Sequence, residues 1–247
     1  MQNCPIQRSC WSAAALSALL AGASALAGPA DKVYYPVVER GEREIELRSG
    51  VFKTDESYQR AFVLDVGYSP SDHWTTELVG VYEGESGSGG EWEELEWENI
   101  LTFAEPGEHA LDVGLLAEYE HKLEDGADAI IVGPLLQKEF PSLIANLNLL
   151  FERQIGSDAS DDTALNYAWE LKWRGDAALE FGVQGFGEYG DVSELGAYSE
   201  HRIGPAVFST RRLASGNKFS WDAALLAGID DDAPDAALRV QFDYEIY

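Results

Sequence analysis

The chain has 247 residues and a formal net charge of −27, from 44 acidic and 17 basic side chains. This charge repels the phosphate backbone of nucleic acids, so we expect no nucleic-acid partner. A content of 45% hydrophobic and 11% aromatic residues also argues against acidic disorder.

The first 27 residues have the composition of a secretory signal. Arg8 precedes a small, apolar stretch that ends in the small-x-small pattern Ala25-Leu26-Ala27. We therefore predict a signal peptide over residues 1–27, cleaved after Ala27 or, alternatively, after Ala30. A membrane anchor is the competing interpretation, but the stretch is rich in Ala and Ser, whereas a span needs about 20 strongly apolar residues.

Cys4 and Cys10 both lie in this signal, so the exported chain would hold no cysteine for a disulfide. No later segment carries about 18 apolar residues in a row, which argues against transmembrane helices. Strands that cross a membrane need only about 9 to 11 residues each, so a barrel is compatible with the sequence. Residues 28–41 precede the first predicted strand, and we expect them to lie in the periplasm or to enter the mouth of a barrel.

From about residue 42 onward, apolar and polar residues alternate in runs that are broken by turn signals. One such row consists of Leu165, Tyr167, Trp169, Leu171 and Trp173, with mostly polar residues between them. Strand side chains point to opposite faces with a period of two, so each run has one apolar and one polar face. The pattern predicts an all-β fold, a closed antiparallel up-and-down transmembrane β-barrel over residues 42–247, with its apolar rows outward.

We predict about 12 strands, because an even number lets an antiparallel meander close; ten or fourteen are the alternatives. The predicted strands cover residues 42–52, 58–69, 72–83, 91–104, 109–123, 127–140, 142–155, 163–174, 176–189, 200–211, 217–229 and 236–247.

Tight turns alternate with longer, acidic loops along the chain. Pro and Gly mark the tight turns, for example at Pro70-Ser71 and Arg174-Gly175-Asp176. The longer loops include residues 189–200 and 229–236. Outer-membrane barrels have short periplasmic turns and longer outer loops, so both termini are predicted to be periplasmic and the outer rim to be acidic. The acids either solvate the loops or recruit cations, including divalent ions that bridge to lipopolysaccharide.

Aromatic residues near the predicted strand ends suggest two interfacial girdles. The competing explanation is the general preference of aromatic residues for strands. The girdle at the turn end comprises Tyr68, Trp74, Phe103, Phe140, Trp173, Phe219 and Trp221, and the girdle at the loop end comprises Tyr82, Tyr119 and Tyr189.

Carboxylates dominate the polar rows, which face the predicted lumen. The few inward bases cannot pair them all, and unpaired charge in a dry core is very costly, so the lumen should hold water or cations. A twelve-stranded lumen is intermediate between a filled barrel and an open pore. We expect a narrow channel for cations or small neutral solutes; the alternative is a plugged barrel with a structural or adhesive role. The predicted lumen-lining residues are Glu46, Arg48, Asp65, Glu77, Glu94, Glu96, Glu98, Asp112, Glu118, Glu120, Asn146, Asn148, Glu152, Glu170, Lys172, Glu180, Asp222, Arg239 and Asp243.

The sequence favours neither an enzyme nor a metal or cofactor site. Ser199 and His201 form a Ser-x-His order, the reverse of the His-x-Ser pattern of barrel acyl hydrolases. No His-x-x-x-His or paired-cysteine spacing occurs. The run Asp230-Asp231-Asp232 lacks the spaced ligands of an EF-hand loop.

The segment from His201 to Tyr247 resembles the ends of outer-membrane transporters of the MetA-pathway phenol-degradation type. The likeness rests on Gly204-Pro205-Ala206, Leu226-Ala227-Gly228, the run from Ala236 to Val240 and a final aromatic residue. It implies uptake of small aromatic or hydrophobic compounds. The partners that we expect for the predicted barrel are outer-membrane lipid and lipopolysaccharide, the barrel-insertion machinery and a small-molecule solute.

Overall fold

The computed structural model describes residues 28–54, 57–157, 159–175, 178–195 and 199–247. The predicted signal peptide, residues 1–27, therefore lies outside the described residues. The regular elements are twelve strands: β1 (Arg43–Lys53), β2 (Tyr58–Ser71), β3 (Trp74–Glu85), β4 (Gly90–Thr102), β5 (Asp112–Lys122), β6 (Asp128–Phe140), β7 (Leu143–Ile155), β8 (Thr163–Trp173), β9 (Glu180–Asp191), β10 (Glu200–Arg212), β11 (Lys218–Gly228) and β12 (Ala236–Ile246).

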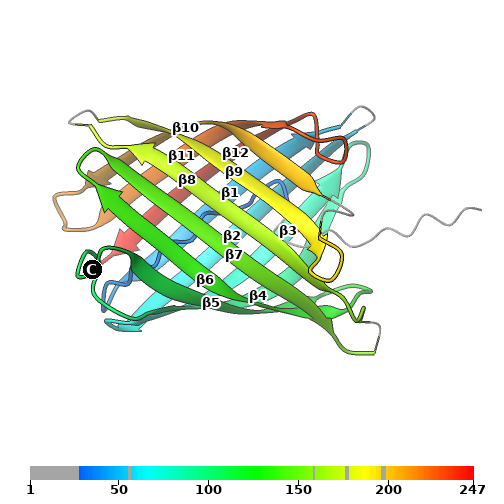
Figure 1. Ribbon diagram of the computed structural model, residues 1–247, viewed down its shortest axis with the longest axis horizontal. Coiled ribbons are helices and arrows are strands. Elements are labelled where there is room, and N and C mark those ends of the chain that lie inside the picture. Colours follow the sequence, from blue (N-terminus) through cyan, green and yellow to red (C-terminus); the bar gives the residue numbers. More distant parts are fainter. Residues whose placement is uncertain (1–27, 55–56, 158, 176–177, 196–198) are drawn as a thin grey trace, which may run out of the picture.

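Each strand pairs antiparallel with its neighbours in sequence, and the sheet closes on itself (Figure 1). The closing pair is β1 with β12, in register from Arg43 opposite Ile246 to Lys53 opposite Ala236. Closure leaves no unpaired strand edge, which is how backbone polar groups are satisfied in lipid. The predicted twelve-stranded, up-and-down barrel is confirmed. No helix in the described part of the chain is long and apolar enough to cross a membrane.

The observed strand bounds follow the predicted ones to within a few residues. One tight turn is displaced: β2 continues through Pro70 to Ser71, and the turn falls on residues 72–73. The register of β2 against β3 shifts between Tyr68 and Ser71. Proline has no amide hydrogen to donate, and such an irregularity is where a sheet tolerates it.

The outward face of the barrel is apolar and exposed. Leu78 is 68% exposed, whereas its neighbour Val79, which points inward, is 2% exposed. Leu225 and Val66 are likewise 59% and 53% exposed. An exposed apolar surface that encircles a protein is typical of a barrel whose outer solvent is lipid.

Several of the aromatic residues predicted for the girdles lie exposed near the strand ends. Phe103 and Trp173, at the end of the barrel that holds the C-terminus, are 67% and 49% exposed. Tyr119 and Tyr189, toward the other end, are 37% and 39% exposed.

Residues 28–41, here called the N-terminal strap, run through the inside of the barrel (Figure 1). Their approach to the wall is close. A Cβ atom added at Gly50 of β1 would lie 1.6 Å from the carbonyl oxygen of Pro29. A Cβ at Gly114 of β5 would lie 2.9 Å from Cβ of Pro36. Each position therefore needs glycine to admit the strap.

The strap also supplies apolar side chains to the interior. Ala30, Val33 and Tyr34 each belong to a different cluster of buried hydrophobic residues on the inner wall. Val33, for example, packs in the cluster that contains Phe52 and Phe186. This segment was expected in the periplasm or in the barrel mouth; in the structure it lies along the lumen.

The first and last described residues lie at opposite ends of the barrel. The Gly28 carbonyl accepts a hydrogen bond from Arg202, near the start of β10, with a donor–acceptor distance of 3.4 Å. Tyr247 follows β12 at the other end and donates a hydrogen bond to Glu245 over 2.6 Å. The expectation that both ends share the periplasmic side is thus not met by Gly28 and Tyr247, because the strap crosses the lumen between them. Which end of the barrel faces the periplasm stays a prediction.

Candidate functional site

The lumen collects most of the charged side chains of the strands. All but three of the predicted lumen-lining residues are buried in the barrel interior. The exceptions, Lys172, Glu180 and Asp243, lie on inward-facing positions of β8, β9 and β12 and are partly exposed. Polar side chains inside and apolar side chains outside are the inverse of the arrangement in a soluble protein. The lumen is therefore the candidate functional site.

Lys32 of the strap is the hub of the lumen. Its Nζ lies 3.1 Å from a carboxylate oxygen of Asp65 and 3.1 Å from one of Glu77. Carboxylate oxygens of Glu98 and Glu46 follow at 3.5 and 3.6 Å. The Lys32 side chain is only 7% exposed. Burial by itself would lower the pKa of Lys32, but the four carboxylates outweigh it and raise that pKa well above its usual value.

Two tyrosines fix the strap next to this hub. The Tyr34 hydroxyl donates to a carboxylate oxygen of Glu98 over 2.9 Å. The side chain of Asn148 binds both backbone polar groups of Tyr34: it accepts a hydrogen bond from the Tyr34 amide at 2.8 Å and donates one to the Tyr34 carbonyl at 2.9 Å. The Tyr35 hydroxyl lies 3.1 Å from a carboxylate oxygen of Glu170. The strap is therefore bound by groups that strand pairing alone would leave without partners.

The other end of the strap is held by an ion pair. Arg202 donates to a carboxylate oxygen of Asp31 over 2.8 Å, and both residues are buried. Burial raises the pKa of the Asp31 carboxyl to about 7, despite the lowering effect of Arg202.

Beside the strap, a network of side chains crosslinks the inner wall near the closing strands. Arg239 of β12 contacts Asp222 and donates to Oε1 of Gln184 at 2.7 Å and of Gln241 at 2.6 Å. Gln241 in turn donates to a carboxylate oxygen of Glu46 over 2.8 Å. The network links β9, β11, β12 and β1, so it stiffens the region where the barrel closes.

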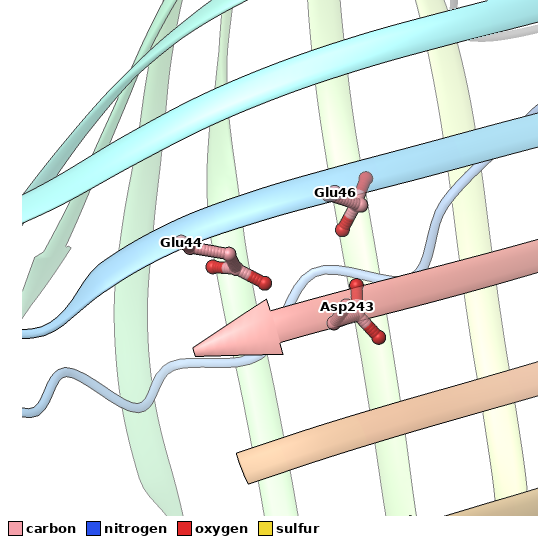
Figure 2. Close-up of side chains that lie close together, drawn as sticks. All are labelled: Glu44, Glu46 and Asp243. Atoms are coloured by element: carbon pink, nitrogen blue, oxygen red, sulfur yellow. The ribbon is translucent and has the colours of Figure 1, made fainter. Parts of the chain in front are cut away.

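A cavity of about 310 Å³ lies between the strap and the wall, in the half of the barrel that holds the C-terminus. Glu44, Glu46 and Asp243 line it, and Figure 2 shows them side by side on β1 and β12. One carboxylate oxygen from each lies within 4.8 Å of the others. Part of this charge is met by Gln241, which donates to Glu46 and to Asp243. Nine carboxylates and three lysines line the cavity, so its wall carries an excess of acidic groups.

Sequence reasoning missed the strap residues of the site, namely Asp31, Lys32, Tyr34 and Tyr35. The polar rows of the strands were taken to form the whole lumen, and the segment before them was expected in the periplasm or at the barrel mouth. One signal was available: Lys32 and two adjacent tyrosines precede a barrel whose inward bases are far outnumbered by its carboxylates. A cation and hydroxyl donors are what such an interior lacks.

His201, the histidine that follows Ser199, lies in an aromatic cluster near the barrel end. Its Nδ1 is 2.8 Å from the Tyr167 hydroxyl, and its Nε2 is 3.8 Å from a carboxylate oxygen of Asp230. Its ring centroid lies 4.7 Å from that of Tyr189. These contacts assign His201 a packing role at the rim.

No family model and no curated protein sequence matches the chain. Among solved structures, an outer membrane channel from Pseudomonas putida F1 is similar, with a TM-score of 0.59 and 12% identity over 87% of this chain and 98% of that one. The NanC porin is similar with a TM-score of 0.53 and 10% identity, over 82% of this chain and 99% of its own. At these identities the likeness concerns the fold. This chain has the barrel fold that outer-membrane channels use.

Proposed function

We propose that the protein is a bacterial outer-membrane channel for small solutes, with a preference for cations. The observation that carries this proposal is the cavity of about 310 Å³ and its carboxylate-rich wall. A confined surface of one charge sign raises the local concentration of ions of opposite sign and repels anions. The exposed apolar belt and the fold similarity support the outer-membrane location.

Small aromatic solutes are a second class of cargo within the same proposal. Tyr35, Phe208 and Trp221 line the cavity together with the carboxylates. Aromatic rings offer faces on which a neutral ring can stack. The resemblance of the C-terminal segment to phenol-degradation transporters points in the same direction.

In this structure the strap closes the lumen. Beyond the large cavity, toward Gly28, it leaves a cavity of only about 30 Å³, the space of a single small ion or water molecule. Solute passage then requires the strap to move. We propose the strap as the element that separates a closed from an open channel.

Planar lipid bilayers with a KCl gradient test the channel proposal. The purified protein should conduct, and its reversal potential should be biased toward K⁺. A variant that lacks residues 28–38 should conduct more than the intact chain. The proposal fails if both proteins are silent where a control porin conducts, or if the reversal potential favours chloride.

A plugged structural or adhesive barrel is the second candidate, and the occupied lumen favours it. In that case, deletion of the strap would destabilise the barrel without producing ion selectivity. Both candidate functions require a folded barrel in the outer membrane, and separate experiments test this. The protein should fractionate with outer membranes and change its gel mobility on heating in detergent. Lipopolysaccharide and the barrel-insertion machinery are the partners that we propose for it in that membrane.

A further inference from the structure

A second group of carboxylates lies on β4 and β5, and its members are not among the residues that line the cavity of about 310 Å³. Glu98 is directly opposite Glu118 in the register of the two strands, and Glu96 is opposite Glu120. One carboxylate oxygen from each of Glu96, Glu98 and Glu118 lies within 4.8 Å of the other two, and the same holds for Glu94, Glu96 and Glu120. Glu96 thus belongs to two overlapping triads. Like charges directly opposite each other in a sheet destabilise it.

Protein cations meet only part of this charge. Glu94 pairs with Lys122, and Glu98 with Lys32 and the Tyr34 hydroxyl. Within the described ranges, no lysine or arginine nitrogen lies within 4.0 Å of a carboxylate oxygen of the remaining three residues, which are Glu96, Glu118 and Glu120.

These three carboxylates are 5%, 4% and 1% exposed, respectively, and each has one buried oxygen without a hydrogen-bond partner. Buried carboxylates in this state are costly unless they bind a cation or a proton.

An independent observation comes from Asn166 on β8. Asn166 is 1% exposed, and its amide nitrogen donates to a carboxylate oxygen of Glu152 over 3.1 Å. Its amide oxygen is buried and has no hydrogen-bond partner. Asn166 lines the same cavity of about 30 Å³ as Glu96 and Glu118. A neutral amide oxygen without a donor is the ligand that a hard cation takes beside carboxylates.

Arg48 also lines this small cavity, but it is engaged elsewhere. Its Nε lies 2.8 Å from a carboxylate oxygen of Glu46, on the side of the Lys32 hub. Lys32 lines the cavity as well, and among Glu96, Glu98 and Glu118 its ammonium group forms an ion pair with Glu98. The volume of the cavity suits one ion or one water molecule.

We propose that Glu96, Glu98 and Glu118 bind a divalent cation, Ca²⁺, in the lumen, with the amide oxygen of Asn166 facing the same space. Ca²⁺ takes oxygen ligands at about 2.3–2.6 Å, so two ligand atoms of one ion lie at most about 5 Å apart, which the triad satisfies. The donors are all oxygens, without histidine or cysteine, which favours Ca²⁺ over Zn²⁺. A bound ion would join β4 to β5 and offset the repulsion between the two strands.

The test uses the whole barrel, folded in detergent, treated with a chelator and titrated with CaCl₂ at constant ionic strength. Isothermal calorimetry and thermal unfolding report binding. The native protein should bind Ca²⁺ and unfold at a higher temperature when Ca²⁺ is present. The double variant E96Q/E118Q should bind at least about tenfold more weakly, because the charge of the ligands sets the affinity. In chelator this variant should be at least as stable as the native protein, since two like charges are gone.

The matched control is D231N/D232N, which removes the same charge from an exposed loop and should retain the Ca²⁺ response. A second variant, N166D, adds a carboxylate at the cavity and should bind Ca²⁺ several-fold more tightly, a gain that misfolding cannot produce. Three outcomes would overturn the site: no Ca²⁺ response in the native protein, an equal response in E96Q/E118Q, or a response lost only in D231N/D232N. Because every readout is binding or unfolding, the result is independent of whether the barrel conducts.

Discussion

Replacing Lys32 with methionine tests whether one lysine holds the strap in the lumen. Methionine keeps an unbranched side chain of similar length and removes the charge. The ammonium group of Lys32 has four carboxylates within 3.6 Å. In the Lys32→Met variant the four carboxylates would lose this ammonium group and keep Arg48 and Gln241 beside Glu46 and the Tyr34 hydroxyl beside Glu98.

The expected loss can be worked from the burial of the group. The Lys32 side chain is 7% exposed and that of Glu98 0%, so solvent screens the pair little. Removing one partner of a buried ion pair costs about 3–5 kcal/mol. We therefore expect Lys32→Met to lower the free energy of unfolding by about that amount at pH 7. The strap should leave the lumen more often, and conductance should rise.

The pH dependence of the difference has a definite sign. The pKa of Lys32 is raised above its usual value of 10.5, so its contribution is fully present below pH 10.5 and is lost only as the pH rises further. The stability difference between the variant and the native protein should thus be constant from about pH 7 to 10.

Urea unfolding in detergent and single-channel recording measure the two effects. Lys122→Met is the matched control, because it removes another lumen lysine, one that contacts Glu94. Among the described residues, no hydrogen bond or ion pair joins Lys122 to the strap. This control variant should lower stability and leave conductance unchanged. The reasoning is refuted if Lys32→Met has the stability of the native protein, or if both variants change conductance equally.

Three further predictions follow from the packing and the charges. Gly50→Ala should displace the strap and raise conductance, because the new Cβ would lie 1.6 Å from a backbone oxygen. At Gly67 the atom nearest to a new Cβ is the side-chain Cγ of Glu77, at 3.1 Å, so Gly67→Ala should leave conductance unchanged. Equal effects of the two variants would contradict the close approach of the strap at Gly50. The pKa of the Asp31 carboxyl is raised from 3.8 to about 7, so the folded state is favoured by the neutral carboxyl and stability falls as the pH rises through that window. The Asp31→Asn variant should therefore lose less stability between pH 4 and 8 than the native protein. An unchanged pH profile of thermal unfolding in this variant would argue against that role of Asp31. Leu78→Arg, on the exposed apolar face, should cost about 2–4 kcal/mol of folding free energy in lipid vesicles. Leu101→Arg, near the end of its strand, should cost about 0–1 kcal/mol. Similar costs at the two sites would count against a lipid-facing belt.

The alternation of residue types was enough to predict the barrel. In the run from Leu165 to Trp173, outward Trp and Leu alternate with inward residues that include Asn166 and Glu170, and the structure has that phase. With a period of two, only one choice of the outward-facing residues is possible, since a shift by one residue would turn every carboxylate toward the apolar solvent. The bounds were less certain, as at Pro70, because turn residues tolerate displacement by a residue or two.

The sequence by itself indicated a closed sheet of about twelve strands and which face of each strand is apolar, because these features depend on local periodicity. It also indicated an interior with too many carboxylates for its own bases. Only the tertiary structure decided how that charge is met. Lys32 contacts Asp65 and Glu98, which lie 33 and 66 residues further along the chain. Glycine is needed at position 50 because the backbone of the strap passes directly beside it. Contacts of this kind depend on where a segment without regular structure lies in three dimensions, and no periodicity in the sequence encodes that path.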